Sequence, residues 1–294
     1  MRIGEQKSYD KMSGETVQEV FEAVCRVAPH ISSGLLKRRE YVGEENPSDE
    51  KQLEADVWAN EFLKEEITSI KGVGQFASEE EKHVTECGDG VSVAIDPLDG
   101  SSNIPTNNLV GTIVGIYDEE LPCKGRNLIS AFYVVYGPLM TLVKAEGGQV
   151  NEYVIEKDRK DQVEIHLASE DIEISEPGVY GIGGNKNWTD EMREFESGIS
   201  QELKLRYGGA LVGDVNQVIH QGGLFSYPDR TDAPEGKLRL LFECNPIAYI
   251  VENAGGASTD TDRSIMDIEA EELHQRTPFF VGNEELVDRA EERF

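Results

Sequence analysis

The chain has 294 residues, of which 57 are Asp or Glu and 28 are Lys or Arg, which gives a formal net charge of −29. So acidic a chain offers no basic footprint for a phosphate backbone and is repelled by anionic lipid, so we expect neither nucleic acid nor a membrane as partner. A hydrophobic content of 38%, with 10 Phe, 10 Tyr and 2 Trp, argues against disorder and predicts one large or two medium domains.

Two amphipathic helices are predicted near the N-terminus, because apolar residues recur there at steps of three and four. The first spans 16–39, with Thr16 and Glu19 as a capping box. The second spans about 53–70 and follows a polar loop at 40–52. Apolar runs separated by turns then predict strands, at 73–77, 91–95, 109–117, 129–136 and 139–144.

Two polar stretches interrupt the second half of the chain: a charged turn at 156–162 and a break at 170–178. The break predicts an N-terminal α/β domain of residues 1–172 and a C-terminal α/β domain of residues 173–294. Further helices are predicted near 189–203, 209–221 and 246–253, and further strands at 237–242 and 278–281. The mixture predicts an α/β or α+β fold whose sheets are covered by helices.

The four cysteines are far apart and form no CxxC pair, and the five histidines are scattered, so no zinc spacing occurs. Reduced thiols and an N-terminus without an apolar leader predict a cytoplasmic protein.

The acidic residues are spread along the whole chain and form no single tail. Because molar salt screens such self-repulsion, the charge suggests a protein from a halophilic source. An ordinary acidic cytosolic protein is the alternative.

Three acidic clusters follow apolar strands at the point where each strand ends. They are Glu79–Glu81, the pair Asp96 and Asp99, and Glu243 after 237–242. In open α/β sheets ligands bind beyond the carboxyl ends of the strands, and converging carboxylates repel one another unless a cation holds them. Oxygen ligands alone favour Mg²⁺, with Mn²⁺ as a second possibility.

The octet Asp-Pro-Leu-Asp-Gly-Ser-Ser-Asn at 96–103 has two uses. Its two carboxylates and the carbonyl of Leu98 suit a cation, while the N–H groups and hydroxyls of Gly100, Ser101 and Ser102 suit a phosphate. Together they are the parts needed for metal-assisted hydrolysis of a phosphate ester. A simple Asx/Ser turn is the alternative, and we favour the functional interpretation for the octet as a whole. For Glu243 alone, a simple partner of the helix dipole remains open.

Cations are scarce in this chain, yet several lie beside tyrosines between residues 206 and 239: Arg206 and Tyr207, then Tyr227, Lys237 and Arg239. They suggest a pocket for a second anionic group. Surface side chains that extend toward water are the alternative.

From about residue 16 to the C-terminus the sequence resembles class I fructose-1,6-bisphosphatase. The octet alone indicates only the wider family of Mg²⁺-dependent, lithium-sensitive sugar and inositol phosphatases, whereas GKLRLLFECNP is very specific. The segments that carry the resemblance are 96–103, 125–137, 206–228, 236–256 and 274–282.

The resemblance implies a layered α/β/α/β/α sandwich, a homotetramer, and gluconeogenic hydrolysis of fructose 1,6-bisphosphate at its 1-phosphate. Close alternatives are a bisphosphatase that also accepts sedoheptulose 1,7-bisphosphate and an inositol-type monophosphatase. A module that binds cations without catalysis is the alternative from another class.

Carried over by position, the resemblance assigns water activation to Glu80 and Asp56 and places Asp49 and Glu50 on a mobile flap. The Mg²⁺ ligands that it implies are Glu79, Asp96, Asp99, Glu243 and the carbonyl of Leu98. The substrate ligands that it implies are Gly100, Ser101 and Ser102 at the 1-phosphate, Tyr207, Tyr227 and Lys237 at the sugar and 6-phosphate, and Arg206 from a neighbouring subunit.

The chain departs from the family in two places. Where relatives carry an Asn-Glu-Gly type of segment for the 6-phosphate, residues 182–188 read IGGNKNW, so that Asn185 or Lys186 is left as the substitute. Where animal enzymes carry threonines and a Lys-Tyr pair for AMP, this chain has Gly14, Gln18, Gly90 and Val91. Weak or absent inhibition by AMP is therefore predicted.

Overall fold

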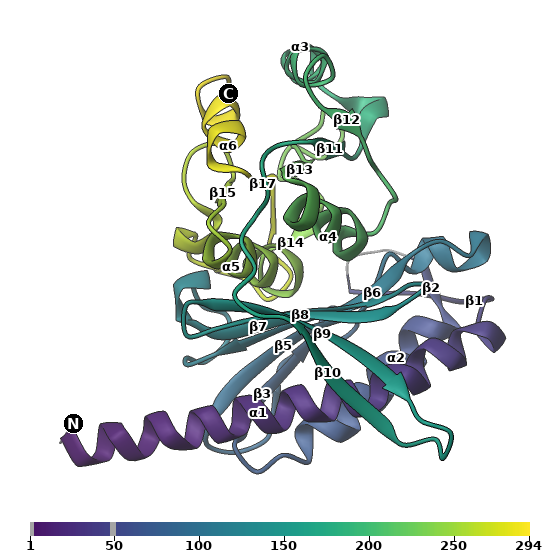
Figure 1. Ribbon diagram of the computed structural model, residues 1–294, viewed down its shortest axis with the longest axis vertical. Helices are drawn as coiled ribbons and strands as arrows, with labels where there is room; N and C mark the ends of the chain where they lie inside the picture. Colours follow the sequence, from purple (N-terminus) through teal and green to yellow (C-terminus); the bar gives the residue numbers. More distant parts are fainter. Residues whose placement is uncertain (1–2, 48–50) are drawn as a thin grey trace.

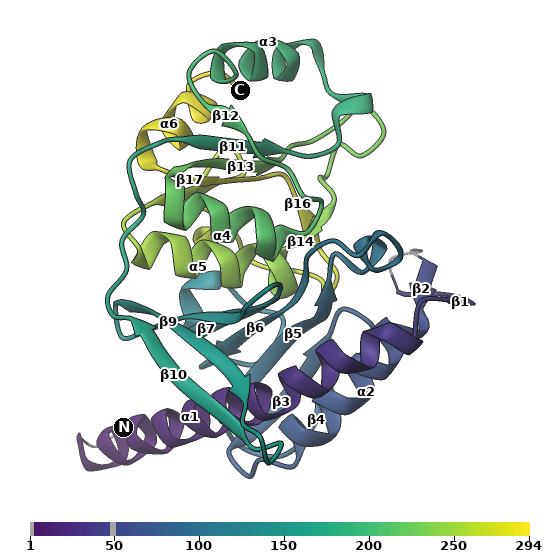
Figure 2. The ribbon, with the colours of Figure 1, turned by 45° about the vertical axis from the view of Figure 1, so that its right-hand side comes forward.

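Five layers of helix and sheet alternate in the protein, as Figures 1 and 2 show for the computed structural model, which describes residues 3–47 and 51–294. The outer helices α1 (Ile3–Gly34) and α2 (Glu54–Thr68) cover one face of a large sheet. The helices α4 (Leu211–Gln221) and α5 (Asn245–Asn253) lie between this sheet and a second one. The outermost helices are α3 (Asp190–Ile199) and α6 (Glu284–Glu291). The predicted α/β/α/β/α sandwich is confirmed.

The large sheet has eight strands in the order β10-β9-β8-β7-β6-β5-β3-β4. Only β3 and β5 run parallel to each other; the other neighbours are antiparallel. The strands are β3 (Val73–Ser78), β4 (Thr85–Glu86), β5 (Val91–Asp99), β6 (Val110–Tyr117), β7 (Leu128–Tyr136), β8 (Met140–Glu146), β9 (Gln149–Lys157) and β10 (Val163–Ser169).

Both faces of the large sheet are buried, which explains why its central strands read as continuous apolar runs. In β7, Phe132 and Val134 pack under α1 and α2, while Ala131 and Tyr133 pack against the α4 and α5 layer. This alternation follows from the two-residue period of a strand.

The second sheet has five strands in the order β12-β11-β13-β17-β15. They are β11 (Val179–Ile182), β12 (Lys204–Leu205), β13 (Gly223–Tyr227), β15 (Ala257–Thr259) and β17 (Phe279–Gly282). Residues 170–178 lead from β10 in one sheet to β11 in the other. The division into 1–172 and 173–294 stays a prediction.

Several boundaries differ from those predicted. The first helix begins at Ile3, and the expected loop 40–52 contains a hairpin of β1 (Tyr41–Glu45) and β2 (Lys51–Leu53), whose polar residues gave no alternating signal. The expected strand 237–242 is short: β14 (Leu238–Arg239) pairs with β16 (Arg276–Thr277), and the chain then coils into a π-helix, Leu240–Cys244. Burial on all sides made this apolar run look like a strand.

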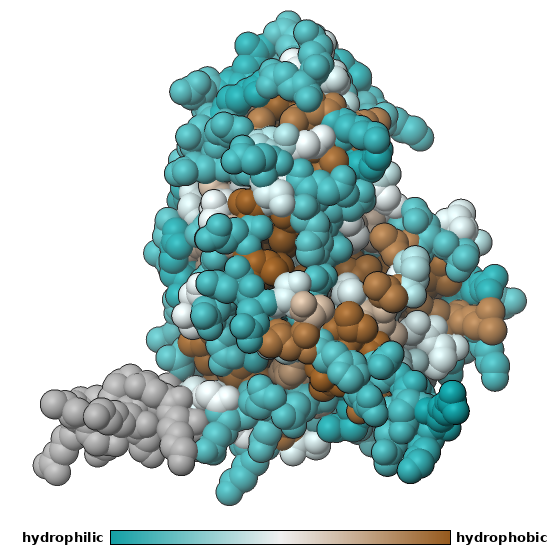
Figure 3. All heavy atoms as spheres, in the orientation of Figure 1, coloured by the Kyte–Doolittle hydropathy of each residue, from teal (hydrophilic) through white to brown (hydrophobic). Residues whose placement is uncertain are grey.

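The surface agrees with the composition. Figure 3 shows hydrophilic side chains over most of one face. In the described part of the chain, no helix combines the length and the apolar character that crossing a bilayer requires.

Candidate active site

Two of the predicted acidic clusters meet because β3 and β5 are parallel neighbours, so that their carboxyl ends lie at the same edge of the sheet. The N–H of Glu79 donates to the carbonyl of Ile95 at 3.0 Å, which places Glu79 beside Asp96. Glu81, the third member of its cluster, instead forms an ion pair with Lys64 at 2.7 Å.

The third cluster reaches the same place through the π-helix. Glu243 lies in this wide turn, and its Oε2 accepts a hydrogen bond from the N–H of Arg239 at 2.6 Å. Single-turn π segments are rare and are frequent at functional sites. One oxygen each of Glu79, Asp96 and Glu243 lies within 4.8 Å of the others, and all three residues are buried.

Arg239 lies among these acids, although the sequence interpretation grouped it with the pocket for a second anion. Its side chain is 3% exposed, with Nη2 at 3.0 Å from Glu79 Oε1 and Nη1 at 3.7 Å from Glu243 Oε2. Arg239 therefore offsets part of the negative charge of the cluster, and that grouping was wrong for this residue.

Burial and mutual repulsion disfavour the charged forms of these carboxylates. Burial, and then the charges of Glu79, Asp99 and Glu243, raise the pKa of Asp96 well above its usual value. Burial also raises the pKa of Asp99 to about 7, although a hydrogen bond from the N–H of Val212 opposes the shift. Buried carboxylates that favour the neutral form in isolation are suited to a hard divalent cation, which restores their charged form.

A cavity of about 410 Å³ opens over this cluster. Among the residues whose burial the structure describes, six acids are buried, and all six line this cavity: Asp56, Glu79, Asp96, Asp99, Asp214 and Glu243. The other lining residues that the sequence predicted are Glu80, Leu98, Gly100, Ser101, Ser102, Tyr207, Tyr227 and Lys237.

Two predicted substrate ligands, Asn185 and Arg206, do not line the cavity. Asn185 is exposed in the short 3₁₀ turn Asn185–Asn187, and the guanidinium of Arg206 donates to the carbonyl of Leu205 at 3.1 Å. Their roles stay predictions, as does the contribution of Arg206 from a second subunit. Asp49 and Glu50 lie outside the described residues.

The two acids predicted to activate water lie at the start of α2 and beyond β3. Asp56 accepts the N–H of Leu53 at 2.7 Å, so the same carboxylate caps the helix and faces the cavity. The side chain of Gln52 donates to Oε2 of Glu80. The hairpin that the sequence did not reveal thus supplies a contact that orients Glu80.

The predicted phosphate nest lies where β5 ends. Gly100 has φ of 73°, and a methyl group there would lie 2.4 Å from Cβ of Ala210, so only glycine fits. A 3₁₀ turn over Ser101–Thr106 follows, in place of the helix start that the sequence suggested.

Tyr207 and Tyr227 line the end of the cavity that borders Gly183. A methyl group at Gly183 would lie 2.5 Å from the Tyr227 ring and 2.9 Å from Oη of Tyr207, so both rings meet at this glycine. Nζ of Lys237 lies 5.6 Å from the centroid of the Tyr227 ring.

The sequence interpretation missed Asp214, which positions the loop that carries Tyr207. Its carboxylate accepts the N–H groups of Gly208 and Gly209 at 2.6 and 3.1 Å, while Asn103 donates to the carbonyl of Gly208 at 2.9 Å. Burial raises the pKa of Asp214 to about 6. No local motif marks this role, because its partners are defined only by the turn before α4.

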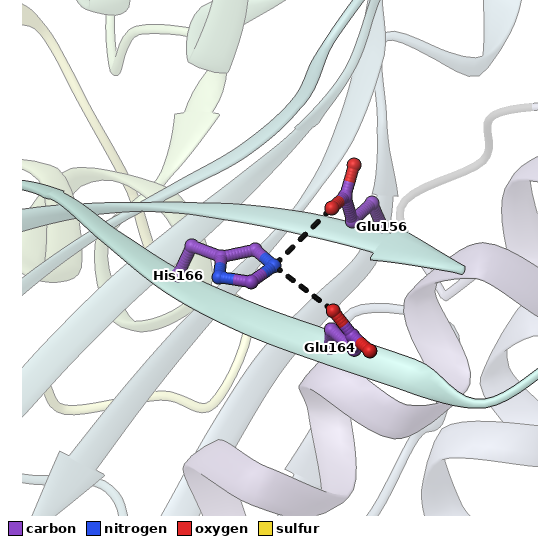
Figure 4. A group of neighbouring side chains, drawn as sticks. All are labelled: Glu156, Glu164 and His166. Atoms are coloured by element: carbon purple, nitrogen blue, oxygen red, sulfur yellow. Dashed lines mark ion pairs between the residues drawn. The ribbon is translucent and has the colours of Figure 1, made fainter. Parts of the chain in front are cut away.

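A second group of acids with a histidine lies on the β9–β10 hairpin (Figure 4). Nε2 of His166 lies 3.2 Å from Glu156 and 3.3 Å from Glu164, which face each other across the strands. All three side chains are at least half exposed. These contacts are those of a surface ion pair that separates two like charges, and we assign no site to them.

Comparisons with known proteins agree with this geometry. Residues 1–166 match the family model described as fructose-1-6-bisphosphatase, N-terminal domain, and residues 174–294 match its C-terminal domain. A class 1 fructose-1,6-bisphosphatase of Natronomonas pharaonis is 49% identical over 281 residues, 94% of this chain and 98% of that protein. One from Haloarcula marismortui is 44% identical over 279 residues, 94% of each chain. Both relatives come from halophilic archaea. The crystal structure of Leishmania major fructose-1,6-bisphosphatase in holo form matches with a TM-score of 0.87 at 28% identity, covering 94% of this chain and 93% of the other.

Proposed function

Because the chain belongs to the class 1 fructose-1,6-bisphosphatase family, we propose that it hydrolyses fructose 1,6-bisphosphate to fructose 6-phosphate and phosphate. The observation that carries this proposal is the convergence of six buried acids on one cavity that Lys237 and two tyrosines also line. The buried acids can hold a metal cation, and Lys237 can bind an anionic group. Together they suit a substrate with two phosphates.

The acidic cluster binds a divalent metal, and the donor set favours Mg²⁺ or Mn²⁺. Glu79, Asp96 and Glu243 offer three buried carboxylates in mutual contact distance, and Asp99 and the carbonyl of Leu98 add oxygens beside them. An all-oxygen set without His or Cys suits a hard cation. When bound, such a cation neutralises phosphate oxygens and stabilises the charge that develops as the ester bond breaks.

Glu80 accepts the proton of the attacking water, with Asp56 beside it in the same cavity wall. The water oxygen forms a bond to phosphorus, and the bond from phosphorus to the C1 oxygen of the sugar breaks. That oxygen leaves with the electron pair and takes up a proton. Gln52 keeps the Glu80 carboxylate turned toward the cavity by its hydrogen bond to Oε2.

The 1-phosphate binds at Gly100, Ser101 and Ser102, where N–H groups and hydroxyls follow the strand end. The sugar and 6-phosphate bind toward Tyr207, Tyr227 and Lys237. The two ends are linked, because Asp99 accepts the N–H of Val212 in the first turn of α4 and Asp214 in the same turn holds the loop before it.

Inhibition by AMP is weak or absent in this proposal. At Gly90, φ is +148°, and a methyl group would lie 1.9 Å from the carbonyl oxygen of Gly72, so this position excludes any side chain. The side-chain amide of Gln18 donates a hydrogen bond to the carboxylate of Glu22, one helical turn away, at 2.8 Å. Neither position offers a cation to a nucleotide phosphate.

The protein acts as a cytoplasmic homotetramer and its acidic surface is adapted to salt, in keeping with the halophilic sources of its relatives. Large apolar side chains at the surface, such as Leu36 and Leu139, both about two-thirds exposed, are available for contacts between subunits.

Phosphate release from fructose 1,6-bisphosphate by the purified chain, with Mg²⁺ and with a chelator, tests the function. Turnover that requires Mg²⁺ and a kcat/KM well above that for inositol 1-phosphate are expected. Comparison with sedoheptulose 1,7-bisphosphate measures substrate breadth. A preference for the monophosphate, or no turnover of any of these esters, would contradict the proposal.

A further inference from the structure

We propose that Arg230 binds the 6-phosphate of the substrate together with Lys237, and so determines preference for a bisphosphate. This inference rests on the proposed hydrolysis of fructose 1,6-bisphosphate. It assigns a role to a residue that none of the sequence motifs singled out.

Two consecutive glycines, Gly183 and Gly184, leave space for the Tyr227 ring and for Arg230. Gly183 lies against both tyrosines of the cavity, as described above. Gly184 has φ of 74°, and a methyl group there would lie 2.6 Å from Cδ and 3.3 Å from Nη1 of Arg230. The guanidinium of Arg230 therefore lies over the backbone at the point where the relatives' Asn-Glu-Gly type of segment is replaced.

Asp232 orients the guanidinium of Arg230. Nε of Arg230 lies 3.1 Å from Oδ1 of Asp232, and its Nη2 donates to Oδ2 at 3.4 Å. Asp232 thus holds one edge of the planar group, while Nη1 is on the side of Gly184. The Arg230 side chain is only 18% exposed, so much of the cost of ordering it is met before substrate binds.

The turn that carries Arg230 is also fixed. The backbone N–H of Arg230 donates to Ala233 at 3.1 Å, and that of Ala233 donates back at 3.0 Å. Thr231 donates to the carbonyl of Asn187 at 3.0 Å, which ties the turn to the segment after the two glycines.

Arg230 and Lys237 supply positive charge beside Tyr227. A phosphate monoester carries about −1.5 to −2 charges at pH 7, whereas the cavity wall is dominated by buried acids and Arg239 is engaged with two of them. Cζ of Arg230 lies 5.7 Å from the centroid of the Tyr227 ring, and Nζ of Lys237 lies 5.6 Å from it. Two cations at one tyrosine supply the positive charge that a dianion needs.

The charge of Arg230 also acts on Tyr207. Burial raises the pKa of the Tyr207 hydroxyl, and Arg230 is the cation whose charge acts to lower it. Arg230 thus acts on both tyrosines at this end of the cavity, one through its ring and one through its hydroxyl.

The test compares Arg230→Ala and Arg230→Lys with the wild type on two substrates, fructose 1,6-bisphosphate and fructose 1-phosphate, which lacks the distal phosphate. The matched control is Arg263→Ala, because Arg263 also lies near an aspartate of its own loop, 3.9 Å from Asp260, but is 60% exposed, whereas Arg230 lies at Gly184 and the Tyr227 ring. All variants are assayed at the same KCl concentration.

For Arg230→Ala we expect KM for the bisphosphate to rise about 10- to 100-fold with kcat within about threefold, as for loss of a charged hydrogen bond. kcat/KM for fructose 1-phosphate should stay unchanged, and Arg230→Lys should recover part of the loss because it keeps the charge. An unchanged KM for the bisphosphate, or an equal loss on both substrates, would overturn the proposal.

Calorimetric binding of fructose 6-phosphate separates this inference from the proposed function. Arg230→Ala should weaken its binding about 10-fold or more, and Arg263→Ala should not. If the wild type fails to hydrolyse the bisphosphate, the function is refuted, yet this measurement still decides the role of Arg230. Equal affinity of wild type and Arg230→Ala would refute that role.

Discussion

Binding of Mg²⁺ to the metal-free protein should release protons, and their number should depend on pH between 6 and 8. In the metal-free cavity burial raises the pKa of Asp99 to about 7, whereas a carboxylate that binds a divalent cation is ionised. The proton on Asp99 must therefore leave when the metal binds.

The size of the effect follows from that pKa. A group with a pKa of about 7 is about 90% protonated at pH 6 and about 10% protonated at pH 8. Asp99 alone should thus release about 0.8 proton more per binding event at pH 6 than at pH 8. Burial, and then the charge of Glu79, also raise the pKa of Asp96, so this residue adds to the proton release. The apparent affinity for Mg²⁺ should fall toward acid pH.

Isothermal titration calorimetry in two buffers of different protonation enthalpy, at pH 6 and at pH 8, counts these protons. Asp99→Asn should abolish most of the difference between the two pH values. Asp288→Asn, on the outermost helix α6, is the matched control and should leave it intact. The same proton count at both pH values in the wild type would refute the assignment of Asp99 as a buried metal ligand.

Further outcomes follow from the same geometry. Glu80→Gln should lower kcat about 100-fold or more with an unchanged circular dichroism spectrum, whereas Glu81→Gln, whose carboxylate pairs with Lys64, should retain turnover; equal losses would contradict the role of Glu80. Asp214→Asn replaces the carboxylate that accepts the N–H groups of Gly208 and Gly209, so we expect a higher KM for the bisphosphate and a loss of about 1–3 kcal/mol in unfolding free energy for the lost charged hydrogen bond, measured by steady-state kinetics and denaturant titration. Because the folded-state pKa values of Asp214 (about 6) and Asp99 (about 7) lie above their ordinary value, the folded metal-free protein binds more protons, and its Tm should fall as pH rises from 5 to 8; a Tm that rises over this range would show the opposite sign. Thermal scans in 50 mM and 2 M KCl should show higher stability in the more concentrated salt, and equal stability would remove the argument for salt adaptation.

The elements that the sequence predicted well share a strong local signal. The helix at 53–70 has a clear helical period, and the strands at 91–95 and 129–136 are apolar runs bounded by turns; the structure has α2, β5 and β7 there. The hairpin of β1 and β2 was missed because its residues are mostly polar. The strands β9 and β10 were not predicted either, although apolar and polar residues alternate over 163–167, which is the pattern of a strand with one exposed face.

In the candidate site too, the residues that could be predicted are those with a local signal in the sequence. Acids that end apolar strands could be recognised from the sequence, because parallel neighbours bring such ends to one edge whatever the rest of the fold. Glu79 and Asp96 are the outcome, whereas Glu243 reaches the same place from the π-helix and not from a strand end. Asp214 could not be recognised, since its acceptor role depends on the turn of residues 208 and 209.

The sequence by itself determined that the protein is acidic, that it combines helices and strands in an α/β or α+β fold, and that carboxylates follow apolar segments, because charge, apolar patterning and residue order are local properties; the layered sandwich was implied by the family resemblance. Only the tertiary structure decided what the scarce cations do. Arg239 lies among the buried acids, Lys237 lies at the tyrosine end of the cavity, and Arg230 reaches Gly184 from a separate turn. An ion pair or a shared pocket depends on distances between segments far apart in the chain, and residue spacing along the sequence does not contain those distances.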